Sequence, residues 1–206
     1  MAYDFGTMVA RIARELRRSN ITADIKAAIN DAIIEASKTR FYLNEMIGYT
    51  FNTVPGQEYY PDLGLNEIDC MWWMNGSSRW NVELENNIDA DNYATGTISG
   101  GQISSYSRYG MQLRLYPIPS TVITLNVSGF GKLAPWPLVA DADTNNWMVE
   151  AERYIRALAK SILMKDVIRD FGEATAYEAI AADLKDDLLS ITESRSATGQ
   201  LQSTQF

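Results

Sequence analysis

Three aspartates near the C-terminus are the first candidates for chemistry, because clustered carboxylates can coordinate a cation. They are Asp183, Asp186 and Asp187, and they lie within one and a half helical turns of each other. Their spacing lacks the turn glycine and the terminal glutamate of a calcium loop. A solvated, acidic helix face explains them better than a metal site.

Two glutamate pairs, Glu83/Glu85 and Glu150/Glu152, have the residue type that glycosidases use for acid and nucleophile. Any acidic chain offers such pairs, and spacing in sequence does not fix the distance between carboxylates. Cys70 stands in an apolar run beside Met71 and Trp72, which favours a buried, inert thiol over a nucleophile.

Composition narrows the chemistry further. Histidine is absent, which removes the commonest general base and the commonest metal ligand. The glycines Gly96, Gly100 and Gly101 lack the Gly-Lys-Ser/Thr ending of a phosphate loop, so they indicate a connecting loop. We expect no catalytic residue, no cofactor and no metal. A single cysteine excludes a disulfide within the chain and fits a reducing compartment.

Two groups of side chains remain as candidates for binding. Arg11, Arg14, Arg17 and Arg18 place four cations within eight positions, which suits DNA, an acidic partner or simply a solvated face. Trp72 and Trp73 are adjacent, so on a strand they point to opposite faces, and one of them is a candidate for a subunit interface. The net charge of −8 argues against nucleic-acid binding over the whole surface.

Helical periodicity frames the two ends of the chain. Met8, Val9, Ile12 and Leu16 predict a first helix, and Thr22 is the expected N-cap of a second, whose apolar stripe comprises Ile25, Ala28, Ile29, Ala32, Ile33 and Ala36. After Pro137 the pattern predicts a helix that Gly172 ends as a C-cap, with a stripe of Ile155, Leu158, Ala159, Ile162 and Leu163. A last helix has Tyr177, Ile180, Ala181, Leu184 and Leu188 on one face.

Strand signals fill the middle. Turns at Pro55-Gly56, Asn75-Gly76 and Arg108–Gly110 separate alternating runs, and residues 86–94 suggest one helical turn. The Pro117–Ser120 corner predicts a tight turn between two antiparallel strands, in an antiparallel set of about six strands.

These elements predict an α+β fold, a helical bundle from the N- and C-terminal helices with an inserted antiparallel β subdomain. The expected division is residues 1–40 and 134–194 in one helical body, 41–133 in the β insert, and 195–206 in a flexible tail. No apolar run reaches the length of a membrane span, and no secretion signal is expected.

The order of these elements, with "FNTVPGQEYYP" after paired helices and "MQLRLYPIPSTVITLNVSGFGKLAPWP" closing the β region, resembles the head-to-tail adaptor (connector, or head-completion) proteins of tailed bacteriophages. Their "T-x-x-G-x-x-x-Y-x-L-P"-like and "LYPxP" elements have counterparts here. The chain departs from that pattern at "YYPDLGLNEID", where a turn precedes the next strand.

The resemblance implies a structural, non-enzymatic virion protein at the head–tail junction, present in host cytoplasm during assembly. It implies a homo-oligomeric ring, typically of twelve subunits, that binds the portal protein and a tail or nozzle protein while DNA passes through its channel without specific binding. A peptidoglycan-degrading virion enzyme and a small nucleic-acid-binding module are the alternatives. The expected interface residues are Arg11, Arg14, Arg17, Arg18, Trp72, Trp73, Asp183, Asp186, Asp187, Arg195 and Phe206. The arginines are expected to oppose the acidic last helix, including Glu178, within a subunit or across a ring seam.

Overall fold

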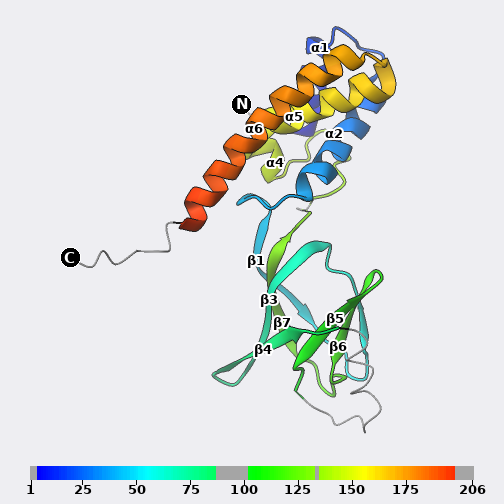
Figure 1. The fold of residues 1–206 in the computed structure, drawn as a ribbon. Coiled ribbons are helices and arrows are strands. Elements are labelled where there is room, and N and C mark those ends of the chain that lie inside the picture. Colours follow the sequence, from blue (N-terminus) through cyan, green and yellow to red (C-terminus); the bar gives the residue numbers. More distant parts are fainter. Residues whose placement is uncertain (1–3, 87–101, 133–134, 198–206) are drawn as a thin grey trace, which may run out of the picture. The chain divides into compact units, whose positions relative to one another are not determined.

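The computed structural model describes residues 4–86, 102–132 and 135–197 (Figure 1). It is a mixed α+β structure that divides into two compact units, which are described separately. The helical unit comprises Met1–Asn44 and Lys132–Phe206, and the β unit comprises Glu45–Gly131.

The helical unit begins with α1 (Phe5–Glu15) and α2 (Thr22–Ser37). Asp4 caps α1 by accepting a hydrogen bond from the Thr7 amide at 2.7 Å, as N-cap aspartates do. The prediction that Thr22 caps α2 is wrong, because Ile21 occupies the cap position and Thr22 is the first helical residue. The Thr22 hydroxyl instead donates backwards to the Ser19 carbonyl.

The C-terminal part of this unit has more breaks than its periodicity indicates. It contains α4 (Asn146–Glu150), α5 (Glu152–Leu163), a π-helical turn η1 (Met164–Ile168) and α6 (Phe171–Ala197). The predicted C-cap at Gly172 is wrong, because Gly172 lies inside α6. The chain turns at Arg169, which adopts the left-handed conformation with φ 62°, and the Asp170 side chain then accepts from the Glu173 amide to start α6.

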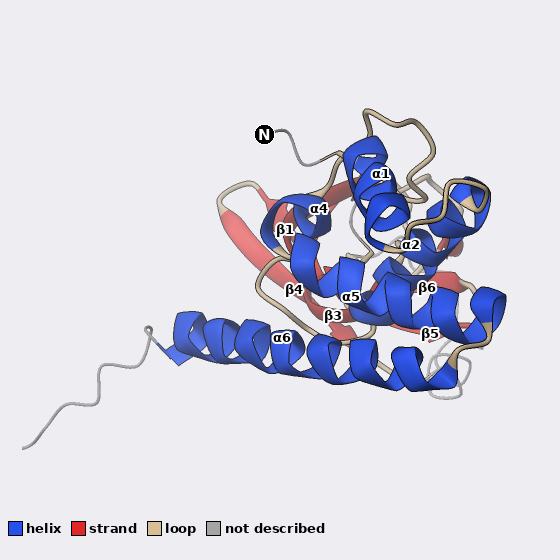
Figure 2. Ribbon diagram, turned by 90° about the horizontal axis from the view of Figure 1, so that it is seen from above, coloured by secondary structure: helices blue, strands red, loops and turns tan. Residues whose placement is uncertain are grey.

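One hydrophobic core joins these helices. The whole predicted stripe of α2 is buried, and Trp147 of α4 packs edge-on against Phe41 with 5.7 Å between ring centroids. α6 lies antiparallel to α5, and its C-terminal half extends beyond α5 (Figure 2). The predicted stripe of α6 is correct at Ala181 and Leu188 and wrong at Ile180, which is 48% exposed. The strict helical-bundle arrangement stays a prediction.

The β unit is a curled seven-stranded sheet with the order β1-β7-β3-β4-β5-β6-β2. Its strands are β1 (Glu45–Asn52), β2 (Tyr59–Pro61), β3 (Leu65–Asn75), β4 (Ser78–Leu84), β5 (Ser105–Tyr109), β6 (Gln112–Tyr116) and β7 (Thr124–Gly131). A second hydrophobic core, including Met71, Leu115 and Leu125, fills this unit. Glu45 pairs with Phe130, so the two ends of the unit lie side by side.

Two hairpin predictions are confirmed. β3 and β4 pair antiparallel across a turn at Gly76 and Ser77, with Asn75 as the last residue of β3, and β5 pairs with β6 across a turn at Gly110. Both glycines have positive φ, 59° and 60°, which explains the residue type at each turn. β4 and β5 pair in parallel, however, so the sheet is not antiparallel throughout.

The prediction of a tight hairpin at Pro117–Ser120 is wrong. β6 pairs with β5 and β2, whereas β7 pairs with β1 and β3, so this corner carries the chain from one end of the sheet to the other. It runs beside the β1–β2 connection, where the Thr53 amide donates to the Ile123 carbonyl and the Gly56 amide donates to the Pro119 carbonyl. β2, the strand that follows the Pro55-Gly56 turn, likewise pairs with β6 and not with β1. Alternation predicts a strand but does not identify its partner.

Candidate interface site

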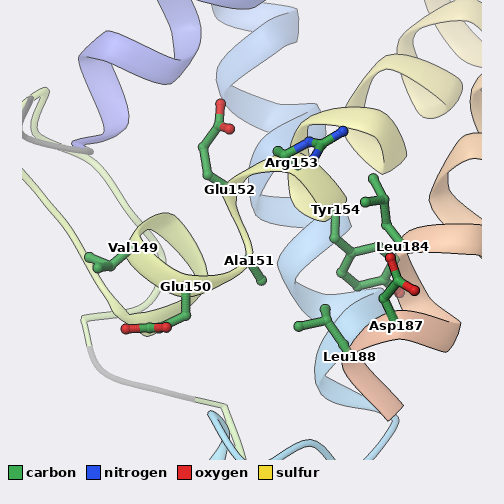
Figure 3. A pocket seen from close by; sticks show the side chains of 9 residues that line it. All are labelled: Val149, Glu150, Ala151, Glu152, Arg153, Tyr154, Leu184, Asp187 and Leu188. Carbon is green, nitrogen blue, oxygen red and sulfur yellow. The ribbon is translucent and has the colours of Figure 1, made fainter. Parts of the chain in front are cut away.

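A pocket of about 260 Å³ opens in the helical unit where α4, α5 and α6 meet. Ala151 separates α4 from α5 with a non-helical backbone, φ −124° and ψ 25°, and this break opens space beside α6. Its lining residues are Val149, Glu150, Ala151, Glu152, Arg153, Tyr154, Leu184, Asp187 and Leu188 (Figure 3). The pocket therefore combines an apolar floor with charged edges.

The charged side chains around the pocket do not all face it. In Figure 3, Tyr154, Leu184 and Leu188 converge from α5 and α6 with Asp187 beside them, while the Glu152 and Arg153 side chains point away. Glu152 is held elsewhere by Arg11 of α1 at 3.3 Å and by Arg156. Glu150 and Glu152 therefore diverge, which is not the arrangement of a catalytic carboxylate pair.

Tyr154 forms part of the floor and stays neutral. Burial, with a smaller contribution from the negative charge of Glu35, raises the pKa of Tyr154 to about 12. Its side chain is only 6% exposed and its ring lies 6.2 Å from that of Phe41. The floor thus offers an aromatic, uncharged surface at any physiological pH.

An ion network next to the pocket fixes α1 on α5. Arg11 and Arg156 each contact both Glu15 and Glu152, and Lys160 also pairs with Glu15. Burial alone would raise the pKa of Glu15, but the bond to Lys160 and the charges of Lys160, Arg156 and Arg11 hold that pKa below its ordinary value. Arg11 is therefore committed within its own subunit.

The other predicted charged residues are distributed along the unit. Arg14, Arg17 and Arg18 are exposed, Glu178 pairs with Lys165, and Arg195 lies over the Tyr42 ring at 3.7 Å. Of the predicted aspartates only Asp187 lines the pocket. Within residues 4–86, 102–132 and 135–197, no group of three or more Cys, Asp or Glu side chains is arranged to hold a metal ion.

Aromatic side chains lie on both faces of the β3–β4 hairpin in the β unit. Trp73 is buried, donates from its indole nitrogen to the Ile103 carbonyl at 3.1 Å, and stacks on Trp80, which is 44% exposed. Trp72 points to the opposite face, as predicted, where the Arg79 guanidinium covers its ring at 4.6 Å. Trp72 and Trp73 are thus both largely engaged inside the unit.

The neighbouring exposed residues were missed by sequence reasoning. Met74, Trp80 and Val122 are 48%, 44% and 64% exposed, and Met74 and Val122 border a hollow that Trp73 also lines. The sequence predicted a strand position for Val122. It did not predict that Val122 lies beside the β3–β4 hairpin, because that neighbourhood depends on the order of the strands in the sheet. Trp80 lies opposite Trp73 in the β3–β4 pairing, so its side chain is on the other face of the hairpin from Met74. We define Met74 and Val122, which border the same hollow, as the hairpin patch.

The prediction that Cys70 is buried is wrong, because Cys70 lies on the same outer face of β3 as Trp72. It is partly exposed, and its sulfur lies 3.4 Å from both the Ser128 hydroxyl and the Arg79 guanidinium. The expected loop at Gly96–Gly101, the helical turn after Asn86 and the predicted interface residue Phe206 lie outside the described residues. α6 continues to Ala197, past the expected start of the tail at Arg195.

The chain matches a protein-family model. No curated protein matches the chain. No described helix is long and apolar enough to cross a membrane. The model of the SU10 adaptor protein family matches residues 3–204, which include both units. This agrees with the resemblance to phage head-to-tail adaptors, and the chain belongs to the SU10 adaptor protein family.

Proposed function

We propose that this protein is a structural adaptor of a tailed-phage virion, which forms a ring between the portal and the tail and continues the DNA channel. The observation that carries the proposal is the family match, because it spans residues 3–204 and so includes the helical unit and the β unit together. A match limited to one unit would support only a shared module.

The surface of the protein supports this role. A closed ring needs two different surfaces on each subunit that fit each other. The helical unit has exposed arginines near the end of α1 and exposed aspartates on α6, and the β unit has the uncharged hairpin patch. These provide charge for register and apolar area for affinity.

The net charge is also consistent with DNA passing through such a ring. DNA affinity comes mainly from neutralised phosphates, and in this chain the 18 Lys and Arg residues are outnumbered by 26 Asp and Glu residues, which gives a net charge of −8. Weak binding is what a channel requires, because its cargo has to move through it.

The proposal is tested by removing the protein from assembling phage. Phage with this gene deleted should accumulate DNA-filled heads without tails, and the purified protein added to these heads should restore tail attachment. Label on the protein should be found at the head–tail junction by electron microscopy. Tailed, infectious particles formed without the protein would overturn the proposal.

A further inference from the structure

Three cations near the end of α1 have no partner within the described chain. Arg14, Arg17 and Arg18 are exposed, and none of them forms an ion pair with a described residue, in contrast to Arg11. Arg17 adopts a left-handed conformation with φ 53°, which turns the chain sharply after α1. The turn presents Arg17 and Arg18 side by side at the α1–α2 corner.

The pocket between α4, α5 and α6 has the complementary character. Asp187 and Glu150 lie at its edges without an ion pair to any residue that the structure describes, while Glu152 is held by Arg11 and Arg156. Tyr154, Leu184 and Leu188 give the pocket its apolar floor (Figure 3). An arginine suits such a site, because its methylene stem packs on apolar surface while its guanidinium pairs with carboxylates.

The two features lie at opposite ends of α5 in the same subunit. Arg11 pairs with Glu152 at the start of α5, and Glu15 pairs with Arg156 and Lys160 further along, so α1 runs parallel to α5. Arg17 and Arg18 follow Glu15 and so stand at the end of α1 that lies beside Lys160. Lys160 is nine positions after Ala151, which at 1.5 Å per residue is about 14 Å along the helix. A subunit therefore cannot place these arginines in its own pocket.

We infer that the Arg17–Arg18 corner of one copy docks into the α4–α6 pocket of the next copy. The inference rests on the proposed ring and names one of its contacts. A donor surface near one end of α5 and an acceptor near its other end make a heterologous contact, the type from which rings are built. Charge complementarity between the two ends selects a second copy over another occupant.

The test uses charge reversal on each side and then on both. R17E/R18E and E150R/D187R should each weaken self-association about tenfold, and equimolar mixing of the two variants should restore it. When the two variants alternate, one junction brings together two reversed surfaces and the next brings together two native surfaces, so the charges are complementary at both. The matched control is Asp31→Lys, an exposed charge on α2 away from both surfaces, which should change nothing. Thermal melts establish that every variant is folded.

A proximity measurement makes the contact direct. In a C70S background, R18C protein mixed with D187C protein and treated with a short bismaleimide should give a covalent dimer, which neither protein gives alone. If the wild-type protein assembles, but the mixed charge variants do not regain self-association and the cysteine variants do not crosslink, the inference is overturned. That outcome would leave the proposed ring intact. Wild-type protein that never assembles, even on portal, would instead overturn the proposed function. If R17E/R18E assembles normally but no longer retains DNA, the arginines bind nucleic acid and the inference is overturned.

Discussion

The helical unit and the β unit expose different kinds of surface. The helical unit has exposed arginines at the α1–α2 corner and exposed aspartates on α6, and it holds its own helices together partly by ion pairs such as those of Glu15. The β unit packs around a hydrophobic core of its own and exposes large uncharged side chains such as Trp80 and Val122. This contrast suggests a division of labour, in which charges of the helical unit set the register of subunits and apolar residues of the β unit supply burial.

The largest expected effect tests whether the units are energetically separate. Trp147→Ala removes a fully buried ring that packs on Phe41, and it should cost the helical unit about 3–5 kcal/mol. Calorimetry should then show the helical transition at a lower temperature and the β transition unchanged. Leu125→Ala, at a fully buried position of the β core, is the reciprocal variant. A single transition that moves equally in both variants would break the comparison.

Two glycines, one in each unit, test the packing of the two units separately. A Cβ at Gly129 would lie 2.1 Å from the Glu67 carbonyl oxygen across the bulged β3–β7 pairing, so Gly129→Ala should destabilise the β unit by about 3 kcal/mol. Gly172 lies in the first turn of α6 with space around it, so Gly172→Ala should stabilise the helical unit by about 0.5 kcal/mol. Urea unfolding measures both, and a stable Gly129→Ala protein would contradict the described packing.

The ion network of the helical unit should give a smaller, pH-dependent effect. Glu15→Gln leaves Lys160 and Arg156 partly buried without that carboxylate and should cost about 1–2 kcal/mol at pH 7. Because the pKa of Glu15 is lowered in the folded protein, its stabilisation is present above its ordinary pKa of 4.5 and lost as pH falls through the folded value. Unfolding free energies at pH 7 and pH 3 should therefore differ less in the variant than in the wild type. An equal pH dependence would contradict the network.

The hairpin patch tests the other side of the division. Val122→Asn changes a 64% exposed residue, so it should alter stability by less than about 0.5 kcal/mol. It should nevertheless weaken self-association, and, unlike R17E/R18E, its effect should not diminish as salt is raised. Sedimentation at two salt concentrations separates the two variants. Normal assembly of Val122→Asn would remove the β unit from the interface.

At neutral pH Tyr154 should give the smallest effect, because its contribution changes only at alkaline pH. Its pKa is raised from 10.0 to about 12 in the folded protein, so the associated stabilisation is complete below pH 10 and lost as pH rises towards 12. Tyr154→Phe should therefore lose less stability than the wild type between pH 9 and pH 11. Parallel urea titrations at those two values measure the difference, and identical losses would indicate that the ring is not buried as described.

The sequence predicted the elements of both units better than their arrangement. The α2 stripe and the hairpin turns at Gly76 and Gly110 follow from local rules, namely helical periodicity and the positive φ that glycine tolerates. The pairing of β6 with β7 was predicted wrongly, because alternation specifies a face and not a neighbour. The pocket was also missed, since it depends on the break at Ala151, a residue that ordinarily favours helix.

The central claim is that this protein works as one subunit of a ring on the portal, and the mass of the assembled complex tests it most directly. Native mass spectrometry of the portal of the same phage, mixed with an excess of this protein, should show one complex that contains a fixed whole number of copies. Portal rings that keep their own mass, beside a protein that stays monomeric, would contradict the account.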